Sequence, residues 1–207
     1  MSQDLYQAAI EYGSSTIYEA SGLDSAVDRA IHAVWLGAAV AGPAYTVHCA
    51  PGDNLAIHIA MEQAPAGSVL VVATNDHVAG YWGEVLTCMA QARGLAGLII
   101  DGGVRDIAAL RRRQFPVFSR GITVKGTIKD SVFSVGQEMA FGGIRVSTGD
   151  LVVADEDGVV FISQAAIEAT LDSAKQRFEK EAAWMQQLEA GKSTLELMNL
   201  IEWRKQA

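Results

Sequence analysis

Two apolar runs on either side of a helical stretch constrain the fold of this chain more than any other feature of its sequence. Residues 68–73 and 95–100 are almost continuously hydrophobic, which is typical of strands buried on both faces of a parallel sheet. Between them, residues 84–93 have a helical pattern that ends at Gly94, a residue favoured just after a helix. Because parallel strands need a crossover connection of about a dozen residues or more, the segment predicts a parallel β–α–β unit and an α/β fold.

Start signals predict three more helices in the first part of the chain. One helix is expected over residues 4–12. A second is expected to start at Thr16, because Glu19 follows it at the spacing of a capping box. Asp53 stands in the N-cap position of a short apolar helix that ends ahead of Pro65.

Short strands are predicted around the β–α–β unit, separated by turns that contain Gly and Asp. The turn Asp101-Gly102-Gly103 is expected to lead through Arg105 and Asp106 into a helix, which must end near Arg113 because Pro116 follows. The further strands are expected at residues 34–41, 44–47, 115–119, 133–134, 144–147, 151–154 and 159–162.

A long amphipathic helix is predicted towards the C-terminus. Apolar residues recur every three or four positions over residues 164–190, and Gly191 follows as a stop signal. Ser193 and Glu196 have capping-box spacing at the start of a last helix that is apolar around most of its surface. Such a helix needs a partner, either the core of its own chain or another subunit.

The length and composition favour one domain. With 207 residues, 50% of them hydrophobic, the chain can bury one substantial core. No internal repeat or low-complexity linker divides it. We therefore expect a single domain over residues 1–207, in which residues 164–207 form a C-terminal helical extension.

Charge and the first residues argue against two classes of partner. A net charge of −8 is unlike that of proteins that bind the phosphate backbone of nucleic acids. Residues 1–12 lack the basic and apolar segments of a leader, and no stretch has the about 18 apolar residues of a membrane helix. Cys49 and Cys88 suggest neither a disulfide framework nor a zinc site. We therefore expect a cytoplasmic protein that binds neither nucleic acid nor membrane.

One candidate anion site lies where the crossover helix begins. Gly83 stands at the junction of a loop and that helix. The first N–H groups of a helix have no partner within the helix, so those of Glu84, Val85 and Leu86 would suit a carboxylate.

A second candidate group follows the strand that ends near Ile100. Arg105 and Asp106 lie past the carboxyl end of that strand, the edge where open α/β sheets usually hold ligands. If this edge meets the helix start at Gly83, the site would bind a 2-oxo acid together with Mg²⁺ or Mn²⁺. Alternatively, Arg105 and Asp106 only cap the following helix and pair with surface charges.

Five motifs, spread along the chain in a fixed order, resemble those of one family. They are Gly83-Glu84-Val85-Leu86, Ala92-Arg93-Gly94, Asp101-Gly102-Gly103-Val104-Arg105-Asp106, Phe115-Pro116-Val117-Phe118, and residues 149–160. Together they resemble the 4-hydroxy-4-methyl-2-oxoglutarate/4-carboxy-4-hydroxy-2-oxoadipate aldolases and their relatives, the RraA-like regulators of ribonuclease E. The resemblance covers residues 16–162. It implies a swivelling β/β/α fold, a homotrimer or homohexamer, and active sites between subunits.

The resemblance also implies roles for the two central residues. Asp106 matches the aspartate that anchors the metal, and Arg105 matches the arginine that binds the oxo oxygen of the substrate. The mechanism implied is that of a class II aldolase, in which the metal and Arg105 stabilise a pyruvate enolate as the carbon–carbon bond breaks. Decarboxylation of oxaloacetate passes through the same enolate and is therefore expected too.

Four further matches complete the implied pocket. Glu84 matches an acidic residue that reaches the metal through water, and Gly83, Val85 and Leu86 match the backbone cradle for the pyruvyl carboxylate. His58 lies in a run that also resembles the family, but we expect it to have a structural role.

Matches to residues donated by a neighbouring subunit are looser. Glu19 and Glu181 take those positions, although each also fits a local role, in a capping box or on a charged helix face. One departure is Ala109, where the family commonly has an acidic residue. Two other functions therefore stay open: a non-catalytic regulator that binds ribonuclease E, and a lyase or hydrolase of the same fold with another substrate.

Overall fold

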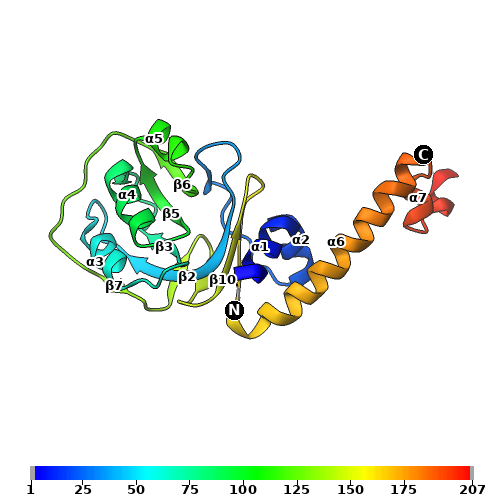
Figure 1. Ribbon diagram of the computed structural model, residues 1–207, viewed down its shortest axis with the longest axis horizontal. Coiled ribbons are helices and arrows are strands. Elements are labelled where there is room, and N and C mark those ends of the chain that lie inside the picture. Colours follow the sequence, from blue (N-terminus) through cyan, green and yellow to red (C-terminus); the bar gives the residue numbers. More distant parts are fainter. Residues whose placement is uncertain (1–2, 206–207) are drawn as a thin grey trace.

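The computed structural model describes residues 3–205, in which a strongly curved sheet is flanked by helices (Figure 1). The strands are β1 (His32–Ala33), β2 (Val40–His48), β3 (Val69–Ala73), β4 (Gly80–Trp82), β5 (Gly97–Val104), β6 (Val117–Ile122), β7 (Ser134–Val135), β8 (Met139–Phe141), β9 (Ile144–Val146), β10 (Leu151–Ala154) and β11 (Val159–Ile162). The α-helices are α1 (Gln3–Tyr12), α2 (Ser14–Ser21), α3 (Leu55–Gln63), α4 (Glu84–Ala92), α5 (Ile107–Arg112), α6 (Ile167–Glu189) and α7 (Thr194–Leu197). Two 3₁₀ helices are η1 (Gln164–Ala166) and η2 (Ile201–Lys205).

The β–α–β unit predicted from the apolar runs is confirmed. Strands β3 and β5 pair in parallel, with Val69 opposite Gly97, and α4 is part of the connection between them. The main path of the sheet runs β1-β6-β5-β3-β2-β10-β11, with β4 beside β5 and β7 beside β2. Strands β2, β3, β5 and β6 pair in parallel, whereas β10 and β11 add to the sheet in antiparallel fashion. The mixed α/β fold expected for the chain is thus confirmed.

Alternate residues of the strands serve different hydrophobic cores. In β5, Leu98 and Ile100 contribute to a core shared with α3, α4 and α5, whereas Ile99 faces a core enclosed by the curved sheet. In β10, Val153 faces a third core, built with α1, α2 and α6. Each fully buried Leu or Ile contributes about 1.5–3 kcal/mol relative to exposure. This burial on both faces explains why the strands are apolar without alternation.

One predicted turn and one predicted strand were wrong. The segment Asp101-Gly102-Gly103 is part of β5 and is buried. Its glycines permit close approach, because a Cβ on Gly102 would lie 2.7 Å from the hydroxyl of Thr74 and one on Gly103 would lie 2.6 Å from a carbonyl oxygen. Residues 34–41, predicted as a strand, form turns up to Val40, where the long strand β2 begins and includes the predicted residues 44–47.

The predicted capping box at Thr16 is also wrong. Helix α2 begins at Ser14, whose backbone N–H and hydroxyl donate to the two carboxylate oxygens of Asp155, at 2.6 Å each. Asp155 lies in the turn between β10 and β11, so the helix is capped from another element. The side chain of Glu19 is consequently available for an ion pair with Arg177.

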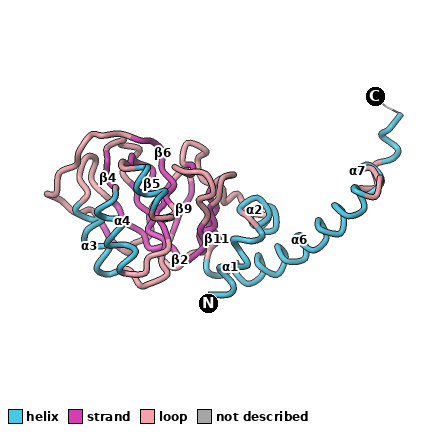
Figure 2. Tube along the Cα trace, turned by 45° about the horizontal axis from the view of Figure 1, so that its top comes forward, coloured by secondary structure: helices cyan, strands magenta, loops and turns pink. Residues whose placement is uncertain are grey.

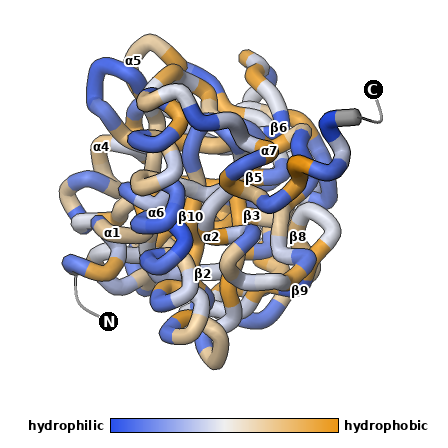
Figure 3. The backbone as a smooth tube through the Cα atoms, turned by 90° about the vertical axis from the view of Figure 1, so that its right-hand side faces the viewer, coloured by the Kyte–Doolittle hydropathy of each residue, from blue (hydrophilic) through white to orange (hydrophobic). Residues whose placement is uncertain are grey.

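The long C-terminal helix is confirmed as α6, and it leads away from the sheet in two views (Figures 1 and 2). The capping box of Ser193 and Glu196 is confirmed at α7. The single last helix that the sequence predicted is instead divided into α7 and η2. Hydrophobic segments lie beside hydrophilic ones near α7 (Figure 3), and Trp203 is 54% exposed. Within residues 3–205, the criteria of length and apolarity for a membrane-spanning helix are not met by any helix.

Candidate functional site

The two candidate segments lie side by side at one end of the sheet. Strand β4 pairs in parallel with β5, which places Trp82 opposite Val104. The next residue along, Arg105, donates its backbone N–H to the carbonyl oxygen of Trp82 at 2.8 Å. The start of α4 therefore meets the residues that follow β5, as the order of the elements led us to expect.

Asp106 connects these segments through its side chain. Its Oδ2 accepts a hydrogen bond from the backbone N–H of Glu84 at 3.0 Å and lies 3.8 Å from Nε of Arg105. Asp106 is the N-cap residue of α5, but its carboxylate makes no capping hydrogen bond to that helix. The part of the alternative in which this carboxylate caps the next helix is therefore wrong. The bond to Glu84 also leaves Val85 and Leu86 as the first N–H groups of α4 that can bind a ligand.

The backbone of Asp106 is in the left-handed region, with φ 60° and ψ 35°. A residue with a side chain pays about 1–3 kcal/mol for such a conformation, and it persists where the surroundings fix it. Here the conformation turns the carboxylate from its own helix towards α4.

Gly83 allows the close approach of these groups. A Cβ on Gly83 would overlap Oδ2 of Asp106 and would lie 3.0 Å from Cγ of Arg105. The position therefore requires glycine for steric reasons, since its φ of −166° is ordinary extended backbone.

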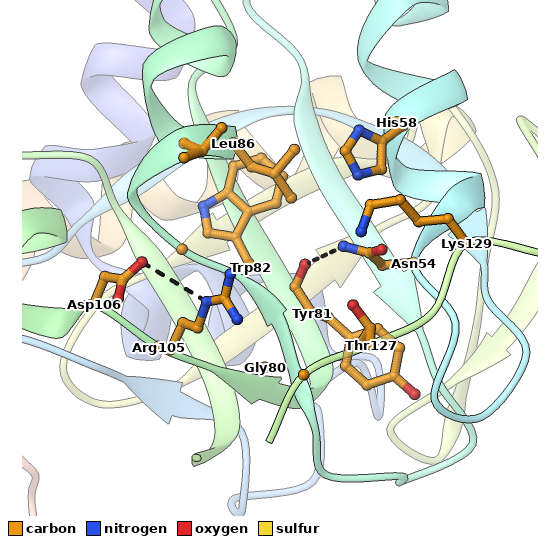
Figure 4. A pocket seen from close by; sticks show the side chains of 13 residues that line it. Asn54, His58, Gly80, Tyr81, Trp82, Leu86, Arg105, Asp106, Thr127 and Lys129 are labelled. Carbon is orange, nitrogen blue, oxygen red and sulfur yellow. Dashed lines mark hydrogen bonds and ion pairs between the residues drawn. The ribbon is translucent and has the colours of Figure 1, made fainter. Parts of the chain in front are cut away.

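These residues border a pocket of about 240 Å³. Figure 4 shows Arg105 and Asp106 at one side and Asn54, His58 and Lys129 at the other. The lining residues are Asn54, His58, Gly80, Tyr81, Trp82, Gly83, Val85, Leu86, Arg105, Asp106, Gly126, Thr127 and Lys129.

The side chain of Glu84 points elsewhere. It pairs with Nε of Arg113 at 3.0 Å and with Arg112 at 3.6 Å, and it does not line the pocket. Glu84 therefore contributes its backbone N–H to the site, while its carboxylate links α4 to α5.

Glu19 and Glu181 are brought together, but away from this pocket. Both carboxylates pair with Arg177, at 2.8 Å in the case of Glu181, where α2 packs against α6. Neither residue lines the pocket of its own chain. Their implied contribution to a neighbouring subunit stays a prediction.

Three polar residues of the far wall were not predicted as site residues. Asn54 and His58 come from α3 and the residue that precedes it, and Lys129 comes from the segment between β6 and β7. Burial, with the charge of Lys129 nearby, lowers the pKa of His58 below its usual 6.5. The sequence run around His58 was a usable signal, whereas no pattern marked Lys129, because a long irregular segment carries it to the pocket.

A divalent cation would find one carboxylate in this pocket. Within residues 3–205 no cluster of three or more His, Cys, Asp or Glu side chains is arranged to hold a metal ion. Asp106 is the acidic residue among those that line the pocket. This suits Mg²⁺, which commonly binds through one or two carboxylates and completes its shell with water and substrate oxygens.

Comparison with known proteins places the chain in a family. Residues 14–161 match the RraA-like family model, described as Aldolase/RraA. A protein of Halalkalibacterium halodurans, named "Putative 4-hydroxy-4-methyl-2-oxoglutarate aldolase", is 39% identical over 139 residues, which are 67% of this chain and 66% of that protein, just under two thirds of its length.

Solved structures agree with this placement. RraAS2 of Streptomyces coelicolor, described as an unusual member of the RNase ES inhibitor RraA family, superposes with a TM-score of 0.80 at 26% identity, over 90% of this chain and 98% of its own. An uncharacterized protein of Pseudomonas syringae pv. tomato has the same fold, with a TM-score of 0.82 at 24% identity over 93% and 96% of the two chains. The chain belongs to the Aldolase/RraA family.

Proposed function

We propose that this chain is a divalent-metal-dependent lyase that releases pyruvate from 4-hydroxy-4-methyl-2-oxoglutarate and related oxo diacids, and that also decarboxylates oxaloacetate. The observation that carries the proposal is the convergence of Arg105, Asp106 and the start of α4 on one pocket. The family relationship and the name of the Halalkalibacterium relative support it.

Different residues would bind the carboxylate and the oxo oxygen of the substrate. The carboxylate of a 2-oxo acid would accept hydrogen bonds from the N–H groups of Val85 and Leu86, where the dipole of α4 also favours an anion. The guanidinium of Arg105 would bind the oxo oxygen and stabilise the negative charge that develops there when the carbon–carbon bond breaks. The guanidinium of Arg105 can take this role, because its ion pair with Asp106 is long, at 3.8 Å, and involves Nε.

Asp106 would hold Mg²⁺ or Mn²⁺ through its carboxylate. When bound, such a cation would supply Lewis-acid chemistry that polarises the oxo group. The hydrogen bond from Glu84 fixes the orientation of the carboxylate before the cation arrives.

Pyruvate release with Mg²⁺, Mn²⁺ or EDTA tests the proposal. Arg105→Ala should lower kcat/KM by about 10²–10³-fold for both 4-hydroxy-4-methyl-2-oxoglutarate and oxaloacetate, the loss typical of a removed charge-stabilising donor. Asp106→Asn should abolish the response to added metal. Arg111→Ala is a matched control, because Arg111 is an exposed arginine of α5 that does not line the pocket. If the wild-type protein turns over neither substrate with metal present, the proposal is wrong.

A second candidate function is supported by one comparison. Similarity to RraAS2, described as belonging to a family of RNase ES inhibitors, favours a regulator that binds a ribonuclease of the E type. Co-purification of that ribonuclease, together with slower RNA cleavage and no metal-dependent release of pyruvate, would favour the regulator over the lyase.

A further inference from the structure

The wall of the pocket opposite Arg105 contains polar side chains that the proposed chemistry does not use. Asn54 precedes α3, His58 lies one turn into that helix, and Lys129 approaches from the segment between β6 and β7. Figure 4 shows the three side chains grouped on one side, with Trp82 and Leu86 between them and Asp106.

Asn54 presents an acceptor that lacks a donor. Its Nδ2 donates to the carbonyl oxygen of Tyr81 at 2.9 Å, which fixes the orientation of the amide. Asn54 is only 5% exposed, and its Oδ1 is buried without a hydrogen-bond partner among the described residues. A buried carbonyl in this state is destabilising, and such groups in native structures call for an explanation. A ligand with a hydroxyl group would satisfy it.

His58, one turn further along α3, also has a buried polar atom without a hydrogen-bond partner within residues 3–205. Its Nε2 is buried and has no partner in the part of the chain that the structure describes. Because residues four apart lie on the same face of a helix, Asn54 and His58 border the same pocket wall. The lowered pKa favours the neutral imidazole, which can donate one N–H to an anion.

The pocket also contains two cationic side chains. Arg105 and Lys129 are the cationic lining residues, and they lie on opposite sides of the pocket, with Asp106 on the Arg105 side (Figure 4). A ligand with one anionic group at each end and a hydroxyl near the second end would match both cations and the free acceptor.

We propose that Asn54, His58 and Lys129 form a subsite for the leaving half of a hydroxy-oxo diacid. Its hydroxyl donates to Oδ1 of Asn54, and its distal carboxylate pairs with Lys129 and accepts from His58. The inference rests on the proposed lyase function and adds that this subsite determines which diacid is cleaved.

The subsite should separate the two reactions of the enzyme. A hydroxy-oxo diacid keeps its distal carboxylate charged throughout aldol cleavage, so a cation beside it stabilises both substrate and transition state. Oxaloacetate has no such hydroxyl, and the carboxylate that it loses must give up its charge as carbon dioxide forms. A cation at that carboxylate therefore gives decarboxylation no advantage.

Lys129→Met tests the subsite, with Lys125→Met as the matched control, because both lysines are exposed and Lys125 does not line the pocket. We expect Lys129→Met to lower kcat/KM for 4-hydroxy-4-methyl-2-oxoglutarate at least about tenfold, mainly through KM, the loss typical of a charged hydrogen bond. Oxaloacetate decarboxylation should stay within about threefold of wild type. His58→Leu should act in the same direction, and His58→Gln, which retains a donor, should restore part of the activity.

Calorimetric measurement of ligand binding in the presence of Mg²⁺ tests the subsite independently of the proposed lyase reaction. Citramalate carries a hydroxyl, a methyl and two carboxylates but cannot be cleaved, and pyruvate probes the Arg105 side alone. Lys129→Met should weaken citramalate at least about tenfold and leave pyruvate within about twofold. If the protein binds pyruvate and Lys129→Met leaves the affinity for citramalate unchanged, the subsite is wrong, whereas the proposed lyase function is not affected. Failure of the wild-type protein to bind either compound would overturn both proposals.

Discussion

Gly83 is the single residue on which the geometry of the pocket depends most closely. Its missing side chain allows the carboxylate of Asp106 to reach the N–H of Glu84 across the gap between two segments. The sequence marked Gly83 as the start of a helix, and it also marked Arg105 and Asp106. It gave no sign of the direction of the Glu84 carboxylate, since that depends on Arg113, which a separate helix places beside it.

Gly83→Ala should therefore disrupt catalysis more than stability. The new methyl group would displace Asp106 and Arg105, and displacement of catalytic groups by about 1 Å can cost about 10²-fold in rate. Overpacking of this kind costs about 1–3 kcal/mol of stability, so the protein should still fold. Steady-state kinetics and thermal unfolding measured on one sample would check both effects. Wild-type kcat/KM in a folded Gly83→Ala protein would contradict the steric account of this position.

At the scale of elements, Asp53 connects α3 to the segment that carries Lys129. Its buried carboxylate accepts hydrogen bonds from the backbone N–H groups of Leu55, Asp130 and Ser131 at 2.7–2.9 Å. The sequence predicted Asp53 as an N-cap. The structure makes Asn54 the N-cap residue, yet Asp53 still accepts from the first N–H of the helix. The bonds to residues 130 and 131 could not be predicted, because they depend on a segment without periodicity.

Asp53→Asn should loosen this connection. An amide cannot accept all these hydrogen bonds, and its NH₂ group would face N–H donors, so we expect the melting temperature to fall by a few degrees. Burial opposes ionisation of Asp53, but the hydrogen bonds from Leu55, Asp130 and Ser131 outweigh it and lower the pKa below its usual 3.8. The carboxylate therefore stabilises the fold above that pH, and the stabilisation is lost as the pH falls through the lowered pKa. Wild-type and Asp53→Asn melting curves should thus converge on acidification, and a constant difference down to pH 2 would contradict this role.

The regular elements were the predictable part of the fold. Strands β3, β10 and β11 follow from apolar runs, which suit strands buried on both faces. Helices α4 and α6 follow from the helical period, which defines the one face that can be buried. Strands β4 and β8, with three residues each, were not predicted because such lengths show no period. The glycines of β5 were predicted as a turn, because the sequence does not show that Gly102 packs closely against Thr74, which lies on another segment.

At the scale of the whole molecule, α6 and the residues after it extend from the sheet and expose apolar side chains. Met185, Met198, Ile201 and Trp203 are 48–55% exposed. We expect these side chains to be covered by another subunit, since large exposed apolar patches are typical of protein contact sites. The family resemblance implies a homotrimer or homohexamer, in which Glu19 and Glu181 would reach the site of a neighbour.

Sedimentation equilibrium should therefore give three or six times the 22.0 kDa mass of one chain. Trp203→Ser combined with Ile201→Ser should shift the protein towards smaller species, because it removes apolar area from the proposed contact. Wild-type protein that sediments as a single chain at all concentrations tested would rule out the shared site.

A crystal structure of the protein soaked with Mg²⁺ and pyruvate would show whether Arg105, Asp106 and the start of α4 bind an oxo acid and a cation together. We expect pyruvate in the pocket of Figure 4, with its carboxylate on the N–H groups of Val85 and Leu86, its oxo oxygen at Arg105, and the cation on Asp106. If the pocket stays empty at saturating concentrations of pyruvate and Mg²⁺, the proposed site is wrong. It is also wrong if the two bind without contact to Arg105 and Asp106.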